Sequence, residues 1–193
     1  MNQLDHLIVF LPGPNEVELL FPAAGGLLLD PGTRHVGQGT RNRRVIFDNC
    51  YVELLWVDSP VDAKASGLRF EDRCAGRACP FGVVLRGRVP AAGFTEYIVP
   101  GGPTLKILDD PHLPFIGVYE ADDPERSPQM RRQRREYLND AEVLHAQISN
   151  ARQATEIEVS GLAFVVGEPQ MTLTLTGVQG QLRLTPGEEW SRS

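Results

Sequence analysis

Residues 4–11 (LDHLIVFL), near the start of the chain, form a mostly apolar run that contains Asp5 and His6. A run of this length is typical of a β-strand, in which successive side chains point to opposite faces. One face then carries Leu4, His6, Ile8 and Phe10, and the other carries Asp5, Leu7 and Val9. The pattern therefore predicts a strand that places a histidine on an otherwise apolar face.

A short helix and three further strands are predicted after this first strand. Asn15 is a suitable N-cap for a helix over EVELLF, which Pro22 and the glycines at 25 and 26 would end. Strands are predicted at residues 26–30 (GLLLD), 43–47 (RRVIF) and 50–57 (CYVELLWV), the last two joined by an Asp48-Asn49 turn. The predicted order is strand, helix and three strands.

The last of these strands carries a glutamate among apolar residues. Alternation places Glu53 on the same face as Tyr51, Leu55 and Val57. An ionised carboxylate that is buried without a partner costs several kcal/mol, so a metal, a cation or a hydrogen-bond donor is expected beside it. His6 is in a similar position, and neutral imidazole is the commonest transition-metal ligand in proteins. The alternative is that His6 is a core histidine and that Glu53 pairs with Arg43 or Arg44.

The connection between the second and third predicted strands is rich in polar and glycine residues (GTRHVGQGTRN, residues 32–42). Its residues His35, Thr40 and Asn42 would present hydrogen-bonding groups to a ligand if the loop borders a pocket. Alternatively, Thr and Asn beside glycines commonly cap turns by bonding to their own backbone. The sequence leaves both interpretations open.

The segments LDHLIVF, RHVGQGTRNR and YVELLWV resemble the first module of a glyoxalase-like domain of the vicinal oxygen chelate superfamily. The resemblance implies an α+β fold in which paired βαβββ modules form a curved mixed sheet shaped as a cup, the first module covering about residues 4–58. It implies that His6 and Glu53 are metal ligands, with Glu53 as the catalytic residue. It also implies that His35, Thr40, Asn42 and Tyr51 bind the substrate.

A second module, less complete, is expected at about residues 79–120. The strand ACPFGVVLRG has Phe81 or Gly82 where the resemblance calls for a second histidine. Strands are also expected at TLKILDD and LPFIGVYEADD, where Val118 stands at the position expected for an acid. Glu120, two residues further on, is the substitute that we expect as a third metal ligand, unless it is a strand-end residue in water.

The remaining residues, about 128–187, are expected to add one longer helix and further strands. From about Gln129, helical spacing gives an apolar stripe of Tyr137, Ala141, Leu144 and Ile148. Three strands are predicted after it, at TEIEVSGLAFVV, MTLTLTG and QLRLTPG. No linker interrupts the chain, so residues 1–193 are expected to form a single domain.

The composition of the chain limits the classes of molecule that it is expected to bind. The chain has 193 residues, 41% of them hydrophobic, and a net charge of -6, which argues against general attraction to nucleic acid or anionic membranes. Three cysteines without a CxxC pair suit a reducing compartment. The first apolar run breaks at Pro12, far short of the ~20 residues of a membrane span, and no basic region precedes it. We expect a cytoplasmic protein, monomeric or homodimeric, with a small-molecule ligand.

Two function classes follow from the resemblance. The first is an enzyme, a lyase, isomerase or dioxygenase, that uses a divalent ion (Zn, Mn, Fe, Mg or Ni) to act on a small molecule with vicinal oxygens. The second is a module that binds or sequesters a small molecule of the antibiotic type without turnover. The missing second histidine favours the second class, whereas His6 and Glu53 favour the first. No nucleophile elbow or cysteine-histidine motif points to another chemistry.

Overall fold

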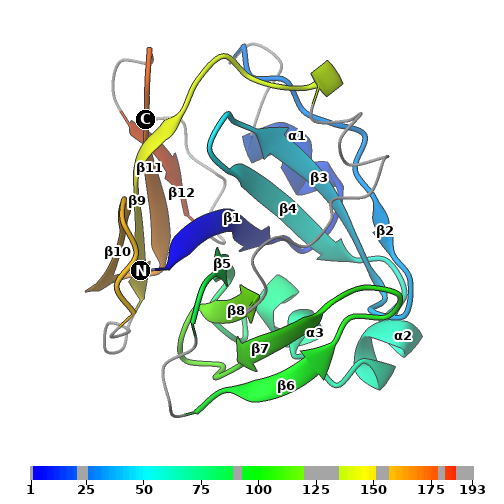
Figure 1. Cartoon of the computed structure of the whole chain (residues 1–193). Coiled ribbons are helices and arrows are strands. Elements are labelled where there is room, and N and C mark those ends of the chain that lie inside the picture. Colours follow the sequence, from blue (N-terminus) through cyan, green and yellow to red (C-terminus); the bar gives the residue numbers. More distant parts are fainter. Residues whose placement is uncertain are drawn as a thin grey trace.

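The computed structural model of the chain (Figure 1) describes residues 2–20, 26–88, 93–119, 135–150, 157–177 and 181–185. The first module consists of β1 (Gln3–Phe10), α1 (Asn15–Leu20), β2 (Arg34–His35), β3 (Thr40–Ile46) and β4 (Tyr51–Val57). The second contributes β5 (Phe81–Arg86), β6 (Thr95–Ile98), β7 (Thr104–Leu108) and β8 (Phe115–Tyr119). The order of strand, helix and three strands is as predicted, with the second strand at other residues than expected.

The two modules join in one mixed sheet of eight strands, in the order β2-β3-β4-β1-β5-β8-β7-β6. Each module repeats one plan, because β1 is parallel to β4 and β5 is parallel to β8, while β1 and β5 pair antiparallel at the centre. The sheet curls into a half-barrel (Figure 1). The predicted α+β class with a curved mixed sheet is therefore confirmed.

The two ends of the sheet order approach each other through the turns that follow β2 and β6. A Cβ atom built on Gly37 would lie 2.9 Å from the Cγ atom of Pro100. Gly37 has a φ of +81°, in the left-handed region that favours glycine. Only a residue without a side chain therefore fits this contact easily.

The strand predicted at residues 26–30 is wrong, because the second strand is the two-residue β2. Residues 26–30 instead run beside β3 and are held there partly through a side chain. The N–H of Asp30 donates to the carbonyl of Arg44, and the N–H of Arg44 donates to the Asp30 carboxylate. A carboxylate thus replaces a backbone carbonyl as acceptor, which sequence alternation does not indicate.

Two short helices that the alternation pattern did not predict, α2 (Pro60–Ala65) and α3 (Phe70–Cys74), connect the modules. Ser59 caps α2 by accepting a hydrogen bond from the N–H of Asp62, and Pro60 occupies the first turn, where its missing N–H costs nothing. α3 packs against β4 and β1. None of the helices among the described residues is long and apolar enough to span a membrane.

The two faces of the eight-stranded sheet bury separate apolar clusters. We call the face that carries His6, Ile8 and Phe10 the inner face, and the opposite one the outer face. The inner cluster joins strand residues with residues of α3, including Phe10, Leu55, Phe70 and Phe115. The outer cluster joins residues such as Leu7 and Val83 with the C-terminal strands. The inner face therefore combines an apolar part, covered by α3, with the polar part that contains His6.

The C-terminal strands form a second sheet in the order β10-β9-β11-β12. It contains β9 (Val143–Asn150), β10 (Leu162–Val166), β11 (Gln170–Leu175) and β12 (Gln181–Leu184), beside the first sheet in Figure 1. The three predicted C-terminal strands are confirmed, since each predicted segment overlaps one of these elements.

The predicted longer helix is wrong over residues 137–150, because this segment includes β9. Leu144, part of the predicted helical stripe, is 55% exposed. Ala146, Ile148 and Asn150 are buried and the residues between them are partly exposed, so burial there alternates with the period of a strand. Pairing with β10 and β11 on its two sides supplies the backbone partners of β9. The part of the predicted helix at residues 129–134 lies outside the described residues.

Candidate functional site

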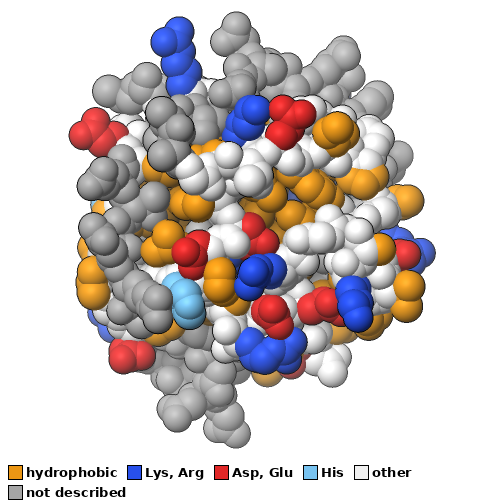
Figure 2. Space-filling model, turned by 90° about the horizontal axis from the view of Figure 1, so that it is seen from below, with side chains coloured by type: hydrophobic (Ala, Val, Ile, Leu, Met, Phe, Trp, Pro, Cys, Tyr) orange, Lys and Arg blue, Asp and Glu red, His pale blue; other side chains and the backbone are white. Residues whose placement is uncertain are grey.

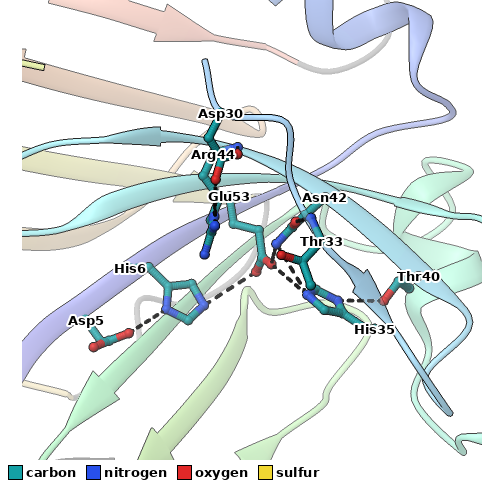
Figure 3. Close-up of polar contacts among 9 residues, drawn as sticks. All are labelled: Asp5, His6, Asp30, Thr33, His35, Thr40, Asn42, Arg44 and Glu53. Atoms are coloured by element: carbon teal, nitrogen blue, oxygen red, sulfur yellow. Dashed lines mark hydrogen bonds and ion pairs between the residues drawn. The ribbon is translucent and has the colours of Figure 1, made fainter. Parts of the chain in front are cut away.

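His6 and Glu53 meet on the inner face at the centre of the first module. The parallel register of β1 and β4 places His6 opposite Tyr51 and Ile8 opposite Glu53, so the histidine and the glutamate are diagonal neighbours on one face. The His6 Nε2 atom lies 3.5 Å from Glu53 Oε2, and both side chains are buried (Figure 3). The two side chains that the resemblance implies as metal ligands therefore lie beside each other.

Asp5 contacts the other nitrogen of the same imidazole. Its Oδ2 atom lies 2.8 Å from His6 Nδ1, and its Oδ1 atom accepts hydrogen bonds from Arg86. Strict alternation predicted Asp5 on the outer face. The pairing of β1 with β5 shifts register between Leu4 and His6, and such a bulge redirects side chains.

Asn42 and His35 approach Glu53 from the side opposite His6 (Figure 3). The Asn42 amide nitrogen donates to Glu53 Oε1 at 2.5 Å and lies 3.3 Å from His35 Nε2. His35 Nε2 is 3.6 Å from Glu53 Oε1, and His35 Nδ1 is 3.0 Å from the Thr40 hydroxyl. Both oxygens of the Glu53 carboxylate therefore have polar partners.

The orientation of the Asn42 amide follows from a backbone contact. The N–H of Thr33 donates to Asn42 Oδ1 at 2.7 Å, so the amide NH2 group must point toward Glu53 and His35. His35 Nε2 then accepts, and its Nδ1–H donates to Thr40. Asn42 thus holds its own loop, as the capping interpretation required, and also contacts the candidate site.

Arg43 and Arg44, considered as partners for Glu53, pair with other carboxylates. Arg44 Nη2 lies 2.6 Å from Asp30 Oδ2 in a fully buried ion pair, and Arg43 pairs with Glu18. The Arg44 guanidinium also lies over the Tyr51 ring, 5.7 Å from its centroid. The Glu53 carboxylate lies beside the His6 imidazole and accepts a hydrogen bond from the Asn42 amide.

The charges of the cluster shift the pKa values of its members in opposite directions. Burial alone would lower the pKa of His6, but hydrogen bonds to Asp5 and Glu53 outweigh it and raise the pKa to about 9. Burial alone would raise the pKa of Glu53, but His6, His35 and Asn42 lower it to about 2. Burial lowers the pKa of His35 despite the nearby Glu53. His6 is thus cationic, and His35 neutral, beside one carboxylate.

Tyr51 closes the cluster beside His6. Burial, reinforced by the carboxylates of Glu53 and Asp5, raises the pKa of its phenol well above the usual value. The group therefore stays neutral at physiological pH. It can supply a ring surface and a hydroxyl to the site but not a charge.

The second module places no histidine or carboxylate on the inner face along its described strands. A Cβ atom on Gly82 would lie 3.1 Å from Phe115 atoms and 3.3 Å from the Phe10 ring, so aromatic packing occupies the space beside this position. Val118, at the position expected for an acid, belongs to the outer cluster. Glu120, the expected third metal ligand, lies outside the described residues.

The structure brings His6, Glu53, His35, Thr40, Asn42 and Tyr51 into one polar cluster (Figure 3). Sequence reasoning missed Asp5 and Arg86, whose roles depend on the bulge. The position of Asp5 directly before His6 was the only indication of its role in the sequence. Regular alternation, however, places Asp5 on the face opposite to His6. His112 and His145, the other histidines, are exposed and belong to a loop and to β9.

A metal would need further ligands besides His6 and Glu53. Among the described residues, no three His, Cys, Asp or Glu side chains form a group that could hold a metal ion. The pair alone matches two ligand positions, because ligand atoms about 2.1 Å from an ion at a tetrahedral angle lie about 3.4 Å apart. The His6 Nε2 and Glu53 Oε2 atoms, 3.5 Å apart, have this spacing.

Comparison with known proteins identifies what the N-terminal part of the chain is similar to. Residues 4–96 match the family model described as glyoxalase-like domain, and this range contains every described residue of the cluster. Over these residues the chain is therefore similar to a glyoxalase-like domain. The predicted resemblance is confirmed.

Two solved structures are similar to the chain at low identity. A hypothetical protein from Staphylococcus aureus has a TM-score of 0.48 and 16% identity, over 97% of this chain and 87% of that chain. A hypothetical protein from Bacillus halodurans C-125 has a TM-score of 0.43 and 13% identity, over 64% of this chain and 99% of that chain. No curated protein matches the chain.

Proposed function

We propose that this chain is an enzyme, of the lyase, isomerase or dioxygenase kind, that acts on a small molecule with two adjacent oxygen atoms. The observation that carries the proposal is the 3.5 Å approach of His6 Nε2 to Glu53 Oε2 inside a glyoxalase-like domain. Burial of two oppositely charged groups costs desolvation free energy, which their mutual attraction or a bound ligand has to offset. Burial and perturbed pKa values are features of catalytic sites.

His6 and Glu53 are the residues that would hold a divalent metal in this proposal, with Glu120 as a further ligand. The donor chemistry fits, because imidazole nitrogen and carboxylate oxygen suit zinc, manganese and iron. Binding would require His6 to lose its Nε2 proton, since a ligating imidazole is neutral at that nitrogen. A bound metal would polarise a substrate oxygen and stabilise developing negative charge.

The remaining residues of the cluster would bind and orient the substrate. Asn42 donates to Glu53 Oε1 and so holds the carboxylate in one orientation. His35 is the least buried member, with a side chain 25% exposed, so it is the member best placed to meet a ligand that arrives from solvent. Glu53 is the group that would accept a proton from the substrate carbon or hydroxyl.

The partner in this proposal is a small molecule. On the face seen in Figure 2, acidic and basic side chains lie next to one another instead of gathering by sign. A strongly basic patch, which binding to nucleic acid or anionic lipid requires, is not visible on that face. The overall charge of -6 points the same way.

Elemental analysis of protein purified without chelator tests the proposal. The native chain is compared with His6→Ala and Glu53→Gln, and His145→Ala serves as control because this exposed histidine lies in the second sheet. We expect close to one divalent ion per native and control chain and a large loss in both site variants. The metal-loaded protein is then assayed with 1,2-dicarbonyl adducts and catechols.

The outcomes separate the proposal from its alternative. Turnover that disappears in Glu53→Gln supports the enzyme. Tight binding of such a compound without turnover, retained in Glu53→Gln, would replace the enzyme with a sequestering module. A native chain that holds no metal and turns over no compound would overturn the proposal.

A further inference from the structure

Asp5 is bound on one side by His6 and on the other by Arg86. The guanidinium of Arg86 donates through Nε, at 2.6 Å, and through Nη2 to the same oxygen, Asp5 Oδ1. The second oxygen, Oδ2, faces His6 Nδ1 at 2.8 Å. Asp5 thus contacts the Arg86 guanidinium through Oδ1 and the His6 imidazole through Oδ2.

The position of Asp5 depends on the bulge in β1. Neighbouring residues of a regular strand point to opposite faces, so Asp5 could not reach the His6 ring without the register shift between Leu4 and His6. The aspartate is 7% exposed and lies beside the buried His6. The bulge therefore places the buried Asp5 carboxylate beside the Nδ1 atom of His6.

Three contacts fix the His6 ring. Asp5 holds Nδ1, the Tyr51 ring stacks against its plane, and Nε2 points toward Glu53. Metal-binding histidines commonly donate their second ring N–H to a carboxylate, which fixes the tautomer and the ring orientation. The arrangement leaves Nε2, and not Nδ1, available to the site.

We propose that Asp5 and Arg86 are positioning residues for His6: Arg86 holds Asp5, and Asp5 holds the imidazole so that Nε2 faces Glu53 and the ligand. This inference rests on the proposed function, because it assumes that His6 Nε2 is the working atom. Arg86 belongs to β5, the strand of the second module that carries no histidine. Through Arg86, the second module thus supports a ligand of the first module.

Asp5→Asn is the most informative variant. Asparagine has the same shape, but one of its two polar atoms is an NH2 donor, so it cannot accept from both Arg86 and His6. Arg86→Met removes the donors and keeps most of the apolar stem. Asp72→Asn and Arg77→Met are matched controls, because Asp72 and Arg77 form an exposed ion pair of the same residue types.

Zinc affinity is measured on metal-free protein by competition with a chromophoric chelator. The temperature is one at which urea titration shows each variant to be folded. We expect Asp5→Asn to bind zinc about 10- to 100-fold more weakly than the native chain. Arg86→Met should show a smaller loss, because His6 keeps its acceptor, and the two controls should match the native chain. Equal affinity of Asp5→Asn and the native chain would overturn the inference.

A metal-free readout keeps the inference distinguishable from the proposed function. Long-range proton–nitrogen spectra of the His6 ring should show a slowly exchanging Nδ1 proton in the native chain and in Asp72→Asn, and its loss in Asp5→Asn. If the native chain binds no zinc, the metal site of the proposed function fails, and these spectra still decide the role of Asp5. An unchanged Nδ1 proton in Asp5→Asn would overturn the inference.

Discussion

The imidazole of His6 lies flat against the ring of Tyr51, with ring centroids 4.4 Å apart and planes inclined by 12°. The two residues are direct partners in the parallel pairing of β1 and β4. The stack is therefore built by the sheet register. It ties the orientation of a site histidine to the packing of the first module.

Replacement of the Tyr51 ring should remove the stacking contact with His6 and lower the stability of the fold. Aromatic pairs contribute about 0.5–1.5 kcal/mol beyond the burial of area, so Tyr51→Leu should lower the free energy of unfolding by at least about 1 kcal/mol more than Tyr51→Phe, which keeps the ring. Urea denaturation of both variants measures this difference. Equal stability of the two variants would show that the stack contributes nothing.

The pKa values of the cluster predict the pH dependence of stability in metal-free protein. The pKa of His6 is about 9, above its ordinary 6.5, so its pairing stabilises the fold fully below pH 6.5 and is lost as pH rises through 9. The pKa of Glu53 is about 2, below its ordinary 4.5, so its contribution is present above pH 4.5 and is lost as pH falls toward 2.

We therefore expect the free energy of unfolding of the native chain to fall between pH 6.5 and pH 9, by about 2–3 kcal/mol. The same urea titrations on His6→Gln, which has no titrating ring at this position, should show a smaller fall. Parallel curves for the two chains across this range would mean that His6 is not held as a cation.

Gly32 should be intolerant of any side chain. It has a φ of +77°, and a Cβ atom would lie 1.7 Å from the carbonyl oxygen of Asn42, a member of the candidate site. Gly67 has a similar φ of +74° with nothing within 4 Å, so Gly67→Ala measures the backbone strain alone. We expect about 1 kcal/mol of destabilisation for Gly67→Ala and well over 3 kcal/mol for Gly32→Ala.

Thermal denaturation of these two alanine variants gives the comparison directly. Gly32→Ala should also alter the chemical shifts of the Asn42 and Glu53 side chains, because the backbone of Asn42 has to move. If Gly32→Ala proves as stable as Gly67→Ala, the close approach to Asn42 is not present in solution.

Arg73 and Asp109 form an ion pair that anchors α3. Arg73 is fully buried and donates to Asp109 Oδ1 at 2.7 Å and to the carbonyls of Cys79, Asp110 and Leu113. Asp109→Ala leaves a buried cation without its carboxylate and should cost about 3–5 kcal/mol in unfolding free energy. Asp72→Ala, which breaks an exposed pair, should cost at most about 1 kcal/mol. Urea titration would contradict this prediction if the two variants were equally stable.

Alternation was enough to predict the strands that carry His6 and Glu53 and to place each residue on an otherwise apolar face of its strand. It succeeded because β1 and β4 are regular where these two side chains point inward. It failed at Asp5, since a bulge is a property of the pairing between two strands and not of one segment. The partners of Glu53 were also missed, because Arg44 is directly opposite in β3 but pairs with Asp30.

The C-terminal part was harder to predict for a different reason. Residues 137–148 fit a helical stripe as well as a strand, and propensity alone does not decide between them. Partners on both sides of β9 determine the outcome. Likewise α3 is too short to show a period, and its place on the inner face depends on Arg73 and on residues of the second module.

The contacts of Arg73 also order events during synthesis of the chain. Its carboxylate partner and two of its carbonyl partners are at positions 109–113, so they leave the ribosome well after the whole first module. Without these partners, packing of α3 on Phe10 and Leu55 would bury the guanidinium without its carboxylate, which is costly. The first module thus emerges carrying all of its polar cluster, but with the apolar half of its inner face open to chaperones and to other nascent chains.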